Sequence, residues 1–276
     1  MPHRKIPALR GLYWCLEAWR ALRASPQPVF SMAMWLSLGV FLPGIQFLVV
    51  FLLTVFYGGV VSTLHKKSHG EKVWLGDFFN GFKSLPRFLS LFMVGFPTVL
   101  FGIFSGTVLM NALGPDMMQS LTQAAGKPPS KELADTIAPL ILGVLLKLLP
   151  AGIVIGWIVF LAVPRAMLDK RLGLLALWDA VRAIFTNIGA LLVFSLCIMI
   201  AAVALSFLLV MPLALIAGAG PVLGSVLQTF ILVFVSTLGW ALYLNAMYIA
   251  WRDIFMSDAV APVPEIKDLP ETQIEV

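Results

Sequence analysis

The sequence predicts an all-α membrane protein, a polytopic bundle of six transmembrane helices built as three repeats of an amphipathic interfacial helix and a transmembrane hairpin. Three observations lead to this prediction. Hydrophobic residues make up 60% of the 276 residues and charged residues only 12%, whereas a soluble domain has about 25% charged residues. Several uncharged stretches are long enough to cross a bilayer. Lys and Arg are concentrated between alternate stretches, which is typical of multi-pass proteins.

The first uncharged stretch, residues 24–64, is too long for a single membrane helix. As one straight helix its 41 residues would extend about 61 Å, about twice the ~30 Å thickness of the hydrocarbon core. The strongest turn signal in this stretch is the pair Pro43 and Gly44, because both residues interrupt regular helices. We therefore predict two spans, 24–43 and 45–64.

Four further spans follow along the chain. Pro86 opens the third at a helix start, and Pro150 marks a kink within the fourth. Gly218 to Pro221 form a turn before the sixth. The predicted spans three to six are 88–110, a helix within 137–164, 187–210 and 222–251.

The basic residues predict the orientation. The N-terminus, the 65–87 and 165–186 loops and the C-terminus hold 5, 5, 4 and 2 Lys or Arg, whereas the opposite side holds Lys127, Lys131 and, at its edge, Lys147. Basic loops stay in the cytoplasm, so both termini are expected there. The predicted location is the bacterial inner membrane, with a long, partly helical outer loop at 111–136.

Three cytoplasmic segments align without gaps and predict an internal repeat. Residues 12–22, 75–85 and 174–184 share apolar positions at i, i+3, i+4, i+7 and i+10, one face of a helix. Each segment precedes two spans. Residues 1–256 are therefore interpreted as one membrane domain with units at about 9–64, 73–168 and 172–255. The acidic tail 257–276, with net charge −4, is predicted to be disordered and cytoplasmic.

The polar positions of these segments also match. Glu17, Asn80 and Asp179 align, and a cation follows each of them three residues later. An aligned apolar face alone could arise by convergence, because every interfacial helix needs one, but the polar match favours duplication. We expect the three cations to contact anionic lipid headgroups. The alternative is that each cation pairs only with the acidic residue of its own helix. The candidate headgroup residues are Arg20, Lys83 and Arg182.

The chain resembles the BPSS-type family of uncharacterised proteobacterial six-span inner-membrane proteins, and more distantly other six-span bacterial inner-membrane families. The resemblance covers about residues 9–255. It implies an inner-membrane location and six spans, and it implies no catalytic residues. The 111–136 loop and the acidic tail lie outside the shared pattern. The residues that carry the resemblance are Trp19-Arg20, Phe82-Lys83, Val181-Arg182, the Gly58-Gly59-Val60 exit and the Phe78–Phe82 pattern.

Several polar residues and small-residue motifs in or near the spans are expected to have structural roles. Lys147 is expected to snorkel to the outer headgroups, and Asn245 is expected to form an interhelical hydrogen bond. The motifs Gly102-x-x-x-Gly106 and Gly152-x-x-x-Gly156 predict close helix contact. His65 and His69 are interpreted as part of a solvated loop rather than a metal site.

The sequence carries no activated nucleophile and no paired acid and base, so we predict no enzyme, no cofactor and no metal. No basic and aromatic nucleic-acid module is present. The predicted function is non-enzymatic: the protein organises lipid, chiefly anionic headgroups, or assists a protein partner in the membrane. The alternative is a transporter or permease for a lipid-like or neutral solute, because transporters often contain repeats. A central cavity of several hundred Å³ with a polar lining would favour transport, and a packed core with an exposed apolar side face would favour an assembly role.

Overall fold

The computed structural model describes residues 3–42, 46–123, 131–217 and 221–256. The predicted turns at 43–44 and 218–220, Lys127 and the tail 257–276 lie outside these residues. The described helices are α1 (Arg10–Ala24), α2 (Val29–Phe41), α3 (Gln46–Ser68), the 3₁₀ helix η1 (Leu75–Phe82), α4 (Leu85–Gln123), α5 (Lys131–Met167), α6 (Gly173–Ala217) and α7 (Pro221–Phe255).

Five of these helices are long and apolar enough to cross a membrane. Their candidate spans are Leu48–Ser68, Leu85–Pro115, Asp135–Met167, Gly173–Phe207 and Val226–Phe255. They confirm the predicted membrane character and correspond to predicted spans two to six.

The predicted first span, 24–43, contains a much shorter helix. α2 has 13 residues, a length of about 20 Å at 1.5 Å per residue. This is less than the hydrocarbon thickness of about 30 Å. Pro26 and Pro28 lie between the end of α1 and the start of α2, and proline at these positions interrupts the backbone hydrogen bonds that would join the two helices.

Two departures from regular helix divide the longer elements. Asn187 has φ −121° and ψ 23° inside α6, so the predicted amphipathic segment 174–184 and the predicted fifth span are separated as expected. Gly114, with φ 73°, breaks α4 near the predicted outer loop, where helix continues to Gln123. This partly helical character was predicted.

The amphipathic segment of the second unit differs from the prediction. Residues 75–82 form a 3₁₀ helix, and α4 begins at Leu85. Gly76 and Gly81 have low α-helix propensity, and Pro86 lacks the backbone N–H that would continue a helix from residues 75–82. The segment therefore ends early instead of forming a regular α-helix through residue 85.

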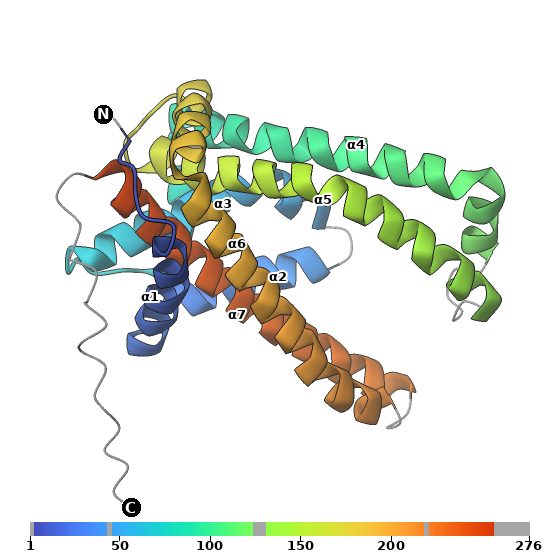
Figure 1. Cartoon of the computed structure of the whole chain (residues 1–276). Coiled ribbons are helices and arrows are strands. Elements are labelled where there is room, and N and C mark those ends of the chain that lie inside the picture. Colours follow the sequence, from blue (N-terminus) through green and yellow to red (C-terminus); the bar gives the residue numbers. More distant parts are fainter. Residues whose placement is uncertain (1–2, 43–45, 124–130, 218–220, 257–276) are drawn as a thin grey trace, which may run out of the picture.

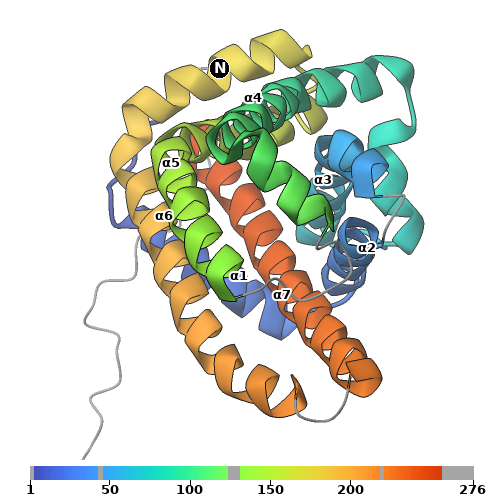
Figure 2. The same ribbon diagram turned by 90° about the vertical axis from the view of Figure 1, so that its right-hand side faces the viewer.

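Two long hairpins diverge from a common base. α4 packs against α5 and α6 packs against α7, and Figure 1 shows the two pairs extending away from the base in different directions. The view in Figure 2 shows α2 and α3 beside α7 and α4 at that base. The far parts of both hairpins expose large apolar side chains, including Ile103, Phe104, Leu145, Phe207 and Phe230. Such surfaces are expected where helices meet lipid.

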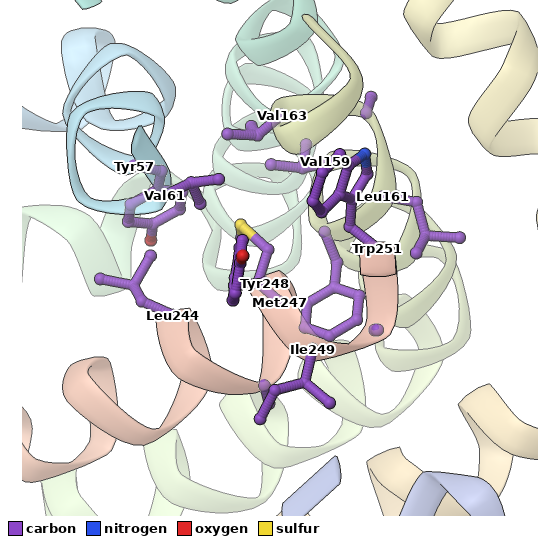
Figure 3. Close-up of a cluster of buried hydrophobic side chains, with 14 of the residues drawn as sticks. Tyr57, Val61, Val159, Leu161, Val163, Leu244, Met247, Tyr248, Ile249 and Trp251 are labelled. Carbon is purple, nitrogen blue, oxygen red and sulfur yellow. The ribbon is translucent and has the colours of Figure 1, made fainter. Parts of the chain in front are cut away.

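The hydrophobic core lies at the base. Trp14, Phe160 and Trp251 are among its largest fully buried side chains. Figure 3 shows side chains from three helices converging there: Tyr57 and Val61 from α3, Val159, Leu161 and Val163 from α5, and Leu244, Met247, Tyr248 and Trp251 from α7. The base thus contains the packed core of the fold, and it positions the charged residues described below.

The glycine motifs have a smaller role than predicted. A Cβ placed on Gly102, Gly106 or Gly156 would meet nothing within 4 Å outside its own helical turn, so the predicted close contact is wrong at these residues. Gly152 does meet the ring of Phe101, at 3.3 Å from such a Cβ. Lys147 is exposed on α5, and its snorkelling stays a prediction.

Candidate lipid-headgroup surface

The basic segments predicted to share one side of the membrane meet at one end of the bundle. The backbone N–H of Arg4 donates to the carbonyl of Ile254 at 2.8 Å, and the ammonium group of Lys67 donates to the carbonyl of Ser25 at 2.6 Å. His3 contacts Thr186 at 2.8 Å. We call this end, formed by residues 3–25, 65–87, 165–186 and 251–256, the polar end.

A buried ion pair joins α1 to α7. Nε of Arg10 donates to a carboxylate oxygen of Asp253 at 2.6 Å, and the indole N–H of Trp14 donates to the same oxygen at 2.9 Å. Glu17 binds Arg10 at 2.7 Å and Arg252 at 3.6 Å. Burial alone would lower the pKa of Arg10, but the two carboxylates outweigh this effect and raise its pKa. Arg10 therefore stays charged in the folded protein.

A second group of ion pairs joins α5 to the start of α6. Arg165, which is almost fully buried, donates to Asp169 and Asp179, each at 2.7 Å. Its guanidinium also lies 4.6 Å from the ring centre of Phe255, and the indole of Trp251 donates to Asp169 at 3.0 Å. The end of α7 is thus fixed to the same cluster.

A third ion pair joins α3 to η1. The ammonium of Lys66 donates to Asp77 at 2.7 Å, and the side-chain amide of Asn80 donates to the same oxygen at 3.2 Å. Burial alone would raise the pKa of Asp77, but the hydrogen bonds from Lys66, the Trp74 backbone and Asn80, with the charge of Lys66, together lower it. The carboxylate is therefore ionised at every physiological pH.

The three candidate headgroup cations lie outside these ion pairs. Arg20, Lys83 and Arg182 are all exposed. Large exposed side chains lie near them in sequence on the same elements, namely Trp19 on α1, Phe79 on η1 and Trp178 on α6. The guanidinium of Arg182 lies 4.9 Å from the ring centre of Trp178.

The alternative interpretation, in which each cation pairs with the acidic residue of its own helix, is wrong in two cases. Glu17 binds Arg10 and Arg252, and Asp179 binds Arg165 and, at 3.6 Å, Arg171. Asn80 donates to Ser62 at 3.1 Å as well as to Asp77. The aligned polar residues thus hold the helices together, whereas the aligned cations face outward.

Sequence reasoning missed the polar residue that holds the N-terminal segment. Asn187, at the kink of α6, accepts a hydrogen bond from the backbone of Ile6 at 2.8 Å and donates to the carbonyl of Arg4 at 3.0 Å. An asparagine between an amphipathic and an apolar segment is a sequence signal for a kink in the helix. Asn245 was expected to bond another helix, but its amide donates to Ala241 of its own helix at 2.7 Å.

The small residues that allow close packing were also missed. Ala18, Gly81 and Ala180 occupy one aligned position of the three segments, six residues after Leu12, Leu75 and Leu174, and all three are buried. A Cβ on Gly81 would overlap the carbonyl of Val55 on α3. Small size at this position therefore lets each segment approach the bundle.

A cavity of about 410 Å³ lies between α5, α6 and α7. Most of its lining is apolar, with Ile153, Phe160 and Leu192 among its walls. The indole of Trp157 donates to Ser195 at 2.7 Å, so these two polar groups at the cavity satisfy each other.

The fold and the exposed apolar hairpins define a polytopic helical membrane protein with one charged end. No family model, no curated protein and no solved structure matches the chain.

Proposed function

We propose that this chain is a non-enzymatic bacterial inner-membrane protein that organises lipid at the cytoplasmic surface. In this proposal the polar end lies at the cytoplasmic headgroups, and Arg20, Lys83 and Arg182 bind anionic lipid. The location rests on the resemblance to the BPSS-type family and on the bias of basic residues, because basic loops remain in the cytoplasm. Assistance to a membrane complex is part of the same proposal.

The observation that carries the proposal is the position of the three cations. Each is exposed at the polar end, close in sequence to an exposed aromatic side chain. Aromatic side chains favour the membrane interface, and each basic residue near an anionic surface contributes about 1 kcal/mol. Three cations therefore contribute roughly 3 kcal/mol, and the acidic residues of their segments are bound elsewhere.

We further propose that the membrane domain consists of three repeated units arranged in a ring. The ion pairs support this arrangement, because each segment contacts the second helix of the preceding hairpin. Glu17 binds Arg252 of α7, Asp77 binds Lys66 of α3, and Asp179 binds Arg165 of α5. α2 and α3 would then form a third, shorter hairpin, which brings the number of membrane-inserted helices to six.

The cavity between α5, α6 and α7 supports this function over transport of a polar solute. Its lining is mainly apolar, and two of its polar groups, Trp157 and Ser195, bond each other. A path for a polar solute needs unpaired polar groups along it. The packed base and the exposed apolar faces of α4 to α7 instead suit contacts with lipid or with another membrane protein.

The test replaces Arg20, Lys83 and Arg182 together with Gln. Native mass spectrometry from vesicles that contain anionic phosphatidylglycerol and neutral phosphatidylcholine should then show less retained phosphatidylglycerol than the unmodified protein. The matched control replaces three exposed loop cations, Lys5, Lys72 and Lys170, with Gln and should retain more than the first variant. Equal retention in the two variants contradicts the proposal.

A further inference from the structure

Two adjoining cavities lie between α2, α3 and η1. The first, of about 590 Å³, is at the polar end and is lined by polar groups that include Ser31, Lys67 and Glu71. The second, of about 460 Å³, lies deeper along α2 and is lined by apolar side chains that include Trp35, Phe56 and Phe79. Leu75 borders both cavities, so the polar and the apolar cavity lie next to each other between α2 and η1.

In the proposed ring each segment also faces the first helix of the preceding hairpin, and we call these three places, including the one between η1 and α2, the seams. The other two seams, α1 with α6 and the start of α6 with α4, are closed by glycine. Gly11 precedes Leu12, and a Cβ on it would overlap the carbonyl of Ala190 on α6. Gly173 precedes Leu174, and its Cβ would come within 2.5 Å of the carbonyl of Ser90 on α4. At both places the absence of a side chain lets two backbones touch.

The aligned residue at the third seam is Trp74. It precedes Leu75, is 70% exposed and lines the polar cavity opposite Pro28 and Ser31 of α2. An indole cannot occupy the space that a glycine leaves, so the two elements stay apart and touch at few points. The cavity thus follows from a specific sequence difference between the units.

The charges of the polar cavity fit a zwitterion. Lys67 provides an ammonium group whose protein partner is the carbonyl of Ser25 at 2.6 Å, and Glu71 provides an exposed carboxylate on the same wall. A phosphate group matches the first and a primary amine the second. The apolar cavity below it, beside the short helix α2, matches an acyl chain.

We propose that the seam between α2 and η1 is a specific site for one phospholipid with a phosphoethanolamine headgroup. The phosphate binds Lys67, the amine binds Glu71, and one acyl chain occupies the cavity beside Trp35 and Phe79. The inference rests on the proposed function in one respect, because it requires the polar end to lie at headgroup level. It is independent of Arg20, Lys83 and Arg182.

The test measures lipid bound to the full-length protein by native mass spectrometry, with equimolar phosphatidylethanolamine, phosphatidylcholine and phosphatidylglycerol. The unmodified protein should retain one phosphatidylethanolamine most strongly. K67Q should weaken that retention about fivefold. E71Q should remove the preference for phosphatidylethanolamine over phosphatidylglycerol, because the amine loses its partner while Lys67 still binds phosphate. Preference for phosphatidylglycerol in the variant that has Gln at Arg20, Lys83 and Arg182, or no change in E71Q, overturns the headgroup assignment.

A cavity-filling variant tests the acyl-chain site without changing a charge. Gly76 lines the apolar cavity, and a Cβ on it would meet nothing within 4 Å. G76L should fill that space and reduce lipid retention, whereas the control G102L on open surface should not. Unchanged retention in G76L overturns the site. The triple variant of Arg20, Lys83 and Arg182 should keep this one lipid, so failure of the headgroup proposal and failure of this site are seen separately.

Discussion

Nε of Arg10 lies 2.6 Å from a carboxylate oxygen of Asp253, and this buried contact ties the first helix of the chain to the last. Both side chains are almost fully buried, with 7% and 1% of their area exposed. Trp14 donates to the same carboxylate. The pair therefore closes the base of the bundle at the point where the chain begins and ends its helical part.

Removal of one partner should be costly. Asp253→Asn leaves the buried guanidinium of Arg10 with Glu17 as its remaining counter-charge. The free energy of unfolding should therefore fall, but by less than the ~3 to 5 kcal/mol lost when a buried charge keeps no partner. Thermal unfolding in detergent measures the effect. The control Arg20→Gln, at an exposed cation, should change the midpoint little. Equal midpoints for the two variants would show that the Arg10–Asp253 contact is dispensable.

Glycine is required where α1 meets α6. Gly11→Ala places a methyl group on the backbone of Ala190, and overpacking of this kind costs about 1 to 3 kcal/mol. Gly102→Ala adds the same group on open surface and improves helix propensity, so it should be neutral or slightly stabilising. If the two variants unfold at the same temperature, α1 does not pack on α6 as described.

Cys15 on α1 and Cys197 on α6 are close enough for their thiols to interact. Oxidation at alkaline pH, where the Cys15 thiolate forms, should join them. A protease site inserted at 124–130 would then yield two fragments that stay linked until reduction, whereas the Cys197→Ser variant should yield separate fragments. Separate fragments from the unmodified pair would contradict the placement of α1 beside α6.

The alkylation rate of the Cys15 thiol should depend on pH. Burial, with Cys197 beside it, raises the pKa of Cys15 to about 11. The neutral thiol is the unreactive form, so alkylation of Cys15 should be slow at pH 8 and should accelerate as the pH rises toward 11. In denaturant the reaction should follow an ordinary thiol with a pKa near 8.5. Fast alkylation of the folded protein at pH 8 would show that the half-buried Cys15 thiol is less shielded from water than in the structure.

Composition and hydrophobic length were sufficient to predict the membrane helices. Spans near 88–110 and 187–210 are uncharged, and no soluble arrangement could bury them. The predicted boundary near Asn187 also held, because the periodic apolar face ends there. The length of α2 could not be predicted in the same way. Residues 24–28 are uncharged and were counted in the predicted span, but they hold two prolines, so α2 begins only at Val29.

Partners distant in sequence could not be predicted. Arg10 and Asp253 are 243 residues apart, and nothing in their local sequences pairs them. The alternative interpretation paired the acidic residues of the aligned segments with neighbouring cations, because i, i+3 pairs are common on helices. In the folded chain, stronger buried partners such as Arg165 are available, and Asp179 binds these instead.

Topology provides a further prediction. In a Cys15→Ser, Cys197→Ser background, a cysteine at Gln119 should react with an impermeant maleimide added outside intact cells. A cysteine at Lys72 should react only after the inner face is exposed. The expectation follows from the fifteen Lys and Arg of the polar end and from the tendency of basic loops to remain in the cytoplasm. The reverse labelling pattern would place the polar end outside.

Depth in the bilayer tests the central claim most directly, namely that three equivalent cations lie at one headgroup level. Spin labels at Arg20→Cys, Lys83→Cys and Arg182→Cys, each in the background free of native cysteines, report depth through their relative accessibility to oxygen and to a water-soluble nickel complex. All three labels should give the same depth, at the lipid phosphates, while a label at Leu100→Cys should lie in the hydrocarbon core. A label at any of the three positions that lies in bulk water or in the core would contradict the account.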